Sequence, residues 1–303
     1  MKLVKIQSFQ LNCNHPLPDM IKNILKAFKK DESTDVILSR FPNEVGQFGF
    51  DPWGFNIKTI EKFISLGKFL YEDYFEVEVE GYENIPESGR CLIIGNHSGQ
   101  LPIDAILLGY ALLKNPIAPR ACKGMYERFI PTIPFFSIWF SQMGGALGDI
   151  ENCIKMLKNE EAVMVFPEGA KGISKPWSKR YQLQKFGNGF LYLAKKTQSP
   201  VIPVGIAGCE EIMYNFGNVD FLQKFLDFPA APLLVPYLFK SKVIIKIGKP
   251  MYFDEKESQE HEINAEVFKV KEEVDKLIKE ALEIRSRKIA EEEEAKATQA
   301  SFK

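Results

Sequence analysis

The feature that most constrains the fold is the alternation of short apolar segments typical of strands with segments that have helical periodicity. The helical pattern is seen at 102–113, 149–161 and 190–198. Such an order predicts an α/β fold, with a mixed, largely parallel sheet flanked by helices. The segments with strand character are 75–82, 91–95, 117–124, 162–166, 201–208 and 242–248.

The same patterns divide the 303 residues into four predicted regions. Residues 1–72 form a helical N-terminal segment, because apolar residues recur at helical spacing in 17–30 and 55–72. Residues 73–255 form the α/β core. Residues 256–290 form a long C-terminal helix that packs on the core through an apolar stripe. Residues 291–303, which include four consecutive glutamates, form a disordered tail.

Composition excludes some functions and favours a compartment. The net charge of −1 gives no general basic field for nucleic acid. Five widely spaced cysteines, without a C-x-x-C pair, predict free thiols in a reducing compartment. We expect no signal peptide and no membrane-spanning helix. Two aromatic apolar segments, 129–145 and 225–239, are either ordinary core and loop or a surface that rests on a membrane.

The stretch CLIIGNHSGQLPID, residues 91–104, carries the first group of reactive residues. His97 follows an apolar strand, and a neutral imidazole is a good general base near neutral pH. Such a base needs a partner on its other ring nitrogen. Asp104 is the candidate partner, since Pro102 can open a helix whose first turn contains it. Taken alone, His97 has the alternative of a purely structural histidine.

Other kinds of chemistry have less support. Ser98 stands one place too late for the G-x-S-x-G nucleophile elbow. Three scattered histidines without a cysteine pair predict no metal site. Neither the G-x-G-x-x-G fingerprint nor a P-loop occurs. The remaining hypothesis is that His97 acts as a base on a hydroxyl group of the substrate itself.

A second polar loop, VFPEGAKGISKPWSKR at 165–180, also follows an apolar strand. Pro167 and Gly169 shape a tight turn after Phe166, and Glu168 either accepts a hydrogen bond from a substrate hydroxyl or holds the turn. The loop's cations favour a phosphate group among them, although they also suit an ordinary solvated loop. They are Lys171, Lys175, Lys179 and Arg180.

With both loops in view, residues 78–208 resemble the glycerophospholipid acyltransferase family, whose members acylate lysophosphatidate and related acceptors. Four pieces occur in the family's order: NHSGQLPID, GGALGDIENCIKML, VFPEG and PVIPVGIAG. The family's first motif is usually N-H-x-x-x-x-D. Here it is two residues longer and is similar to a variant branch with H-[SAT]-G-x-L-P-x-D. The resemblance implies that His97 is the base and that Asp104 orients it.

The acceptor-binding motifs depart from the family pattern. The usual F-P-E-G-T-R ends here in Lys171, which keeps the charge but lacks the bidentate fork of arginine. An arginine of the second motif is also missing. We expect Arg120 or the lysines of 171–180 to replace these arginines. The substrate-binding residues implied by the resemblance are therefore Arg120, Phe166, Pro167, Glu168, Gly169, Lys171 and Lys175.

The resemblance implies a 1-acylglycerol-3-phosphate O-acyltransferase-like enzyme of phospholipid biosynthesis, cytoplasmic and peripheral on the membrane. It would move a fatty acyl group from acyl-CoA or acyl-carrier protein to a hydroxyl of a lysophospholipid or related glycerolipid. The expected partners are the acyl thioester, the lipid acceptor and the membrane surface, without metal, cofactor or nucleic acid. Two alternatives remain open: a thioesterase or lipid hydrolase with the same His97 and Asp104, and a non-catalytic lipid-binding protein.

Overall fold

The computed structural model describes most of the chain. The N-terminal helix expected at 17–30 lies outside the described residues, as does most of the apolar segment 225–239. The described residues are 32–41, 46, 48–97, 101–132, 136–218, 232–234, 238–255 and 260–301.

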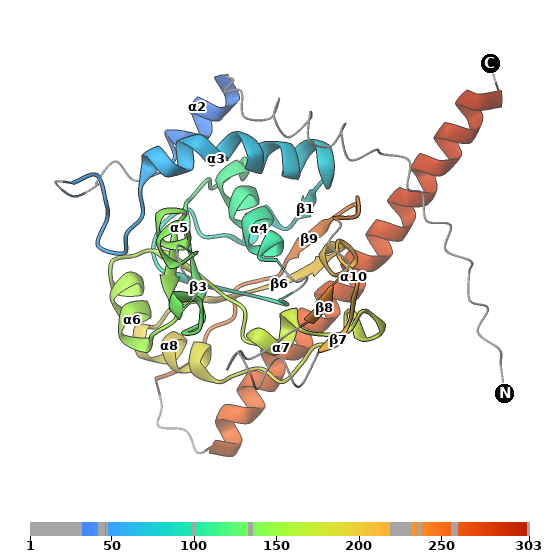
Figure 1. Ribbon diagram of the computed structural model, residues 1–303. Helices are drawn as coiled ribbons and strands as arrows, with labels where there is room; N and C mark the ends of the chain where they lie inside the picture. The colour runs from blue at the N-terminus through green and yellow to red at the C-terminus, as the bar shows by residue number, and fades with distance from the viewer. Residues whose placement is uncertain are drawn as a thin grey trace.

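A seven-stranded sheet forms the centre of the molecule (Figure 1). Its strand order is β1-β9-β6-β2-β5-β3-β4. Strands β6, β2, β5, β3 and β4 pair in parallel, whereas β9 runs antiparallel to β6 and parallel to β1. The sheet is therefore mixed and largely parallel, as predicted. A separate pair joins β7 (Asn215–Asn218) to β8 (Pro232–Leu234). The strands of the main sheet are β1 (Glu78–Glu80), β2 (Cys91–Gly95), β3 (Cys122–Tyr126), β4 (Gly145–Leu147), β5 (Ala162–Val165), β6 (Val201–Ala207) and β9 (Ile244–Ile247).

Helices cover both faces of this sheet. In β2, Ile93 packs with the helices of one face, while Leu92 and Ile94 pack with those of the other. Burial on both faces explains the continuous apolar run of 91–95. The first face carries α3 (Ile57–Phe69) and α4 (Ile103–Lys114), and the second carries α6 (Ile150–Lys158), α8 (Gly189–Thr197) and α10 (Glu260–Ser301).

Shorter helices and single helical turns occupy the segments between these elements. Asp149 caps α6 as predicted, since its carboxylate accepts the N–H of Glu151 at 3.0 Å. The short α-helices are α2 (Glu32–Leu38), α5 (Phe136–Gln142) and α7 (Ala170–Ile173). A π-helical turn covers Leu70–Tyr74, and 3₁₀ turns cover Tyr82–Asn84, Ile130–Thr132, Trp177–Lys179 and Cys209–Glu211.

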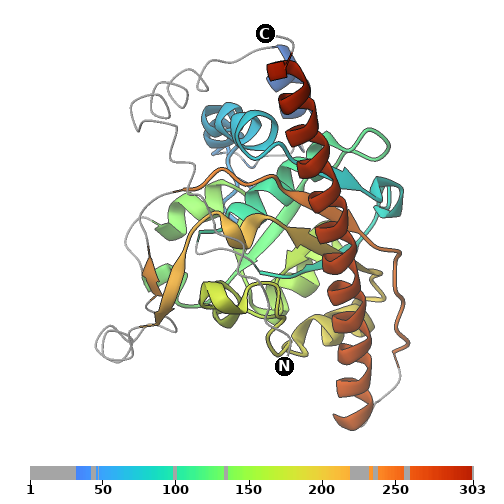
Figure 2. The same ribbon diagram turned by 90° about the vertical axis from the view of Figure 1, so that its right-hand side faces the viewer.

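Helix α10 is the long red helix that crosses the sheet and extends beyond it (Figure 2). It packs closely on β6 at Gly205, where a Cβ atom would lie 2.5 Å from backbone atoms of Leu277 and Ile278. The prediction of a disordered tail at 291–303 is wrong for residues 291–301, because α10 continues through Ser301. Glutamate, alanine and lysine favour this extension, and Glu292 forms an ion pair with Lys242 at 2.8 Å.

Two strands differ from their predicted limits. The strand expected at 75–82 is shortened to β1, because Phe75 is buried directly after the π-helical turn and Gly81 adopts a positive φ of 90°. The strand expected at 117–124 begins later, as β3. No helix within the described ranges is both long and apolar enough to cross a bilayer. The four cysteines among these residues are free thiols.

Candidate active site

The site lies at the edge of the sheet where four parallel strands end. Strands β6, β2, β5 and β3 are neighbours and run in the same direction, so their carboxyl ends share this edge. The loops that follow carry His97 after β2, Phe166 after β5, Glu127 after β3 and Glu210 after β6. Ligands of open α/β sheets gather at this kind of edge. The two polar loops that the sequence singled out therefore meet.

His97 and Asp104 form the pair that the sequence predicted. The Nδ1 atom of His97 lies 2.7 Å from Oδ2 of Asp104. Asp104 is completely buried in the first turn of α4, and its Oδ1 accepts the N–H of Ala105 at 2.8 Å. The carboxylate thus fixes the proton of His97 on Nδ1 and leaves Nε2 as the basic atom. The imidazole retains 17% exposure, which gives it access to a substrate.

Asn96, the residue before His97, fastens this loop to the neighbouring strand. Its amide donates to the carbonyl of Ile206 at 3.0 Å and its Oδ1 accepts the N–H of the same residue at 2.8 Å. Asn96 is fully buried, and these two bonds give both its amide nitrogen and its amide oxygen a partner. The side chain therefore continues the pairing of β2 with β6 beyond the last residue of β2 and fixes where His97 begins its loop.

Two residues of the second loop pack against His97 and restrict its imidazole ring. Phe166 stacks on His97 with ring centroids 4.5 Å apart and an angle of 14° between the planes. Gly172 packs closely on His97, since a Cβ there would stand 2.9 Å from Cβ of His97 and 3.2 Å from its carbonyl oxygen. Packing and hydrogen bonding together restrict the ring to one orientation.

Glu168 ties the two loops together rather than facing solvent. It is 4% exposed. Its Oε1 accepts the backbone N–H of His97 at 3.1 Å, and its Oε2 accepts the N–H of Gln184 at 2.6 Å. Glu168 therefore holds the turn, which was the second of its two predicted roles.

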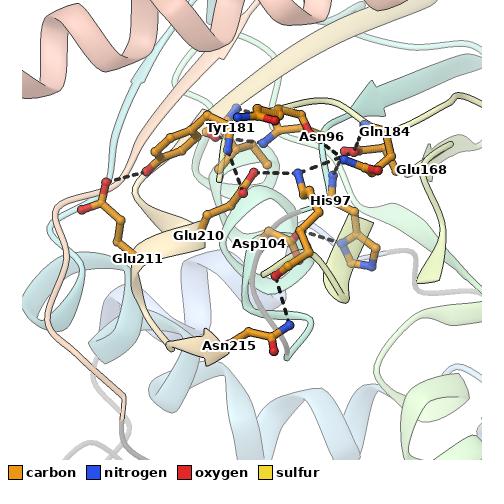
Figure 3. A network of polar contacts seen from close by, with 12 residues as sticks. Asn96, His97, Asp104, Glu168, Tyr181, Gln184, Glu210, Glu211 and Asn215 are labelled. Atoms are coloured by element: carbon orange, nitrogen blue, oxygen red, sulfur yellow. Dashed lines mark hydrogen bonds and ion pairs between the residues drawn. The ribbon is translucent and has the colours of Figure 1, made fainter. Parts of the chain in front are cut away.

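A buried ion-pair network continues from Glu168 (Figure 3). Lys175 lies 3.5 Å from Glu168 and 3.0 Å from Glu210, and all three side chains are buried. Burial raises the pKa of Glu210, and the Lys175 ammonium opposes that rise. Tyr181 extends the network, because its N–H donates to Glu210 at 2.8 Å and its hydroxyl donates to Glu211 at 2.9 Å.

The electrostatic surroundings raise the pKa of His97 above its ordinary 6.5. Burial is the largest influence and lowers this pKa, whereas the Asp104 charge and its hydrogen bond raise it. The carboxylates of Glu168 and Glu127 raise the pKa further. The imidazole is therefore a stronger base than free histidine, and it holds a proton more readily once it has accepted one.

The structure corrects the roles predicted for two cations. Arg120 precedes β3, at the amino end of the parallel strands, and donates to the carbonyl oxygens of Pro86 and Gly89 at 2.9 and 2.6 Å. It lies at the opposite edge from His97 and closes a turn there. Lys175 is buried and paired with two carboxylates, so it stabilises the loop and is not exposed to a substrate.

The other predicted residues stay in the second loop. Lys171 is exposed, Pro167 is partly exposed, and Gly169 has a positive φ of 56° in the turn between them. The sequence did not single out Glu127, whose carboxylate accepts the backbone N–H of Ala170. Glu127 directly follows β3, which ends at Tyr126. The strand was predicted to end at residue 124, so the sequence did not place Glu127 at the carboxyl end of a strand. Among the described residues, no group of three histidine, cysteine, aspartate or glutamate side chains is placed to hold a metal ion.

Curated proteins of other organisms are similar to this chain in sequence. An uncharacterized protein of Mycobacterium leprae is 34% identical over 220 residues, which cover 69% of this chain and 58% of that protein. A Bos taurus protein named "DGAT1/2-independent enzyme synthesizing storage lipids" is 28% identical over 185 residues, covering 59% of this chain and 53% of that protein. The chain thus spans less than two thirds of the length of these curated relatives.

A solved structure shows the same fold. The 1-acyl-sn-glycerophosphate (LPA) acyltransferase PlsC from Thermotoga maritima superposes with a TM-score of 0.50 at 22% identity, covering 86% of this chain and 88% of that chain. At the sequence level, residues 76–207 match the Acyltransferase family. This matched segment contains His97, Asp104 and the turn at 166–170. The His97–Asp104 pair and the turn that packs against it therefore lie within the part of the chain that matches the Acyltransferase family.

Proposed function

We propose that the protein is an O-acyltransferase that moves a fatty acyl group from an acyl thioester to a hydroxyl group of a glycerolipid. The observation that carries the proposal is the His97–Asp104 pair, with Nδ1 and Oδ2 2.7 Å apart at the carboxyl edge of the sheet. This pair lies within the segment that matches the Acyltransferase family. The fold shared with the Thermotoga maritima acyltransferase also supports it.

The proposed reaction is a single displacement. The Nε2 atom of His97 takes the proton of the acceptor hydroxyl, whose oxygen attacks the thioester carbonyl carbon. A carbon–oxygen bond forms, the carbon–sulfur bond breaks, and His97 returns its proton to the leaving thiolate. Asp104 orients the ring and stabilises its charged form. General-base assistance of this kind contributes roughly 10²–10⁴-fold to a rate.

The proposed partners follow from this chemistry. The donor is acyl-CoA or acyl-carrier protein, and the reaction uses no other cofactor. The acceptor resides in a lipid surface, which we place on the cytoplasmic side with the protein bound peripherally. Exposed apolar residues on the β7–β8 pair support contact with lipid, since Phe216 is 72% exposed and Leu233 is 57% exposed.

Thiol release from a long-chain acyl-CoA tests the proposal. We expect release only when a glycerolipid alcohol is present, and loss of that release in His97→Gln. His261→Gln is the matched control, because His261 is exposed on α10 and belongs to no part of the site. Release that does not need an acceptor would establish a hydrolase instead. Full activity of His97→Gln would remove His97 from the mechanism.

A further inference from the structure

Glu127 places a negative charge inside the turn that was expected to receive the acceptor head group. It follows the last residue of β3, and β3 pairs with β5, the strand that leads into Phe166. Its Oε1 accepts the backbone N–H of Ala170. The same oxygen lies so close to Gly169 that a Cβ atom there would collide with it. The carboxylate is thus held against the turn that stacks Phe166 on His97.

This contact occupies a backbone donor that an anionic head group would need. A phosphate bound at a turn is usually held by backbone N–H groups together with nearby cations. Here the N–H of Ala170 already bonds to an anion supplied by the protein itself. A phosphate that approached this turn would have to displace Glu127 and would still experience its repulsion.

The cations of the second loop do little to balance this charge. Lys175 is buried between Glu168 and Glu210. The guanidinium of Arg180 lies over the ring of Trp177, 3.8 Å from its centroid. Lys171 and Lys179 are exposed, so solvent screens their charges.

The field at the imidazole is correspondingly negative. Asp104, Glu168 and Glu127 all act on His97 in the same direction. Arg120, which was expected to supply positive charge, lies at the opposite edge of the sheet. Among the described residues, the side chains that act on His97 therefore disfavour an anionic acceptor and tolerate a neutral one.

We propose that the acceptor is an uncharged glycerolipid alcohol, such as a monoacylglycerol, and that Glu127 selects against an acceptor that carries a phosphate. This inference rests on the acyl-transfer function proposed above. Glu127 acts through charge and through its bond to Ala170, and it takes no part in moving the proton.

The test compares two acceptors that differ only in charge: a 1-monoacylglycerol and a lysophosphatidate with the same acyl chain, presented in uncharged detergent micelles. Ester formation from one acyl-CoA gives kcat/KM for each. We expect the wild type to prefer the monoacylglycerol. In Glu127→Gln we expect that preference to fall by about tenfold, as the loss of one nearby like charge implies. Glu127→Lys should lower it further.

Glu87→Gln is the matched control, because Glu87 is exposed just before β2, at the amino end of the strand. Its preference should equal that of the wild type. A wild type that prefers lysophosphatidate would overturn the inference and leave acyl transfer intact. An unchanged preference in both Glu127 variants, with folding verified by circular dichroism, would exclude Glu127 as the selecting residue. Failure to acylate either acceptor would refute the proposed function and with it this inference.

Discussion

Replacing Asp104 with asparagine should lower the maximal rate and should also change the pH dependence of the rate. The two effects can be measured separately. The pKa of His97 lies above 6.5, so kcat/KM of the wild type should fall as pH decreases through that raised value. Asparagine removes the negative charge but keeps the shape of the side chain. The pKa of His97 should therefore fall, and the acid limb of the pH profile should move to lower pH.

The size of the shift follows from the contact. Opposite charges separated by about 4 Å interact by roughly 4 kcal/mol at an effective dielectric constant of about 20, and each pKa unit corresponds to about 1.36 kcal/mol. These values set an upper limit of roughly three units. Glu168 and Glu127 remain in the variant and continue to raise the pKa. We expect the pKa of His97 to fall in Asp104→Asn, by no more than this limit.

The plateau rate should fall independently of this shift. An asparagine that still accepts the N–H of Ala105 through its oxygen would present its NH₂ group to Nδ1 of His97. The ring proton would then move to Nε2, the atom that must act as the base. A loss of about 10²–10⁴-fold in kcat is expected for a general base that is held in the wrong tautomer.

The assay measures kcat and kcat/KM for thiol release over pH 5 to 9, with acceptor varied from below to above saturation, and an NMR titration follows the His97 ring in parallel. Asp149→Asn is the control, because Asp149 caps α6 and asparagine caps a helix equally well. A reduced plateau with an unmoved acid limb would show that Asp104 does not set the pKa of His97. An unchanged plateau would refute its role in orienting the ring.

Three further substitutions test the packing of α10 on the sheet and the positions of two cations. Gly205→Ala should lower the free energy of unfolding by about 1–3 kcal/mol, measured by urea denaturation, because its Cβ would press on the backbone of α10. Lys175→Met should lower it by about 3–5 kcal/mol by leaving buried carboxylates unpaired; adding Glu210→Gln should recover part of the loss, and no recovery would contradict the pairing. Arg120→Met should lower the melting temperature and leave the acceptor KM unchanged, whereas a raised KM would return Arg120 to the site.

The sheet and the catalytic pair could be predicted because local patterns encode them. The apolar run of 91–95 is buried on both faces, which gives a continuous hydrophobic signal. Asp104 lies only seven residues from His97, within one loop and the first turn of α4, so the motif contains the whole interaction. The predicted limits of α6 and its cap at Asp149 likewise depend on neighbouring residues alone.

The contacts that could not be predicted join distant parts of the chain. Lys175 lies in a lysine-rich loop whose composition favours phosphate binding. Its ion-pair partner Glu210 lies in the loop after β6, which the local sequence around Lys175 does not indicate. Asn96 bonds to Ile206, 110 residues further along the chain. Arg120 shows how strand limits decide function. A strand at 117–124 would place it within the sheet, whereas the observed start at Cys122 places it at the edge away from His97.

The most direct test of the proposed mechanism is a single-turnover experiment with enzyme in excess over radiolabelled acyl-CoA. Free thiol, lipid ester and protein-bound acyl group are counted at each time. With acceptor present, the mechanism predicts that ester and thiol appear together at one rate, without an acyl-enzyme, and that His97→Gln slows both by about 10²–10⁴-fold. Thiol that appears before ester, an acyl group bound to the protein, or an unchanged rate in His97→Gln would contradict direct transfer with His97 as the base.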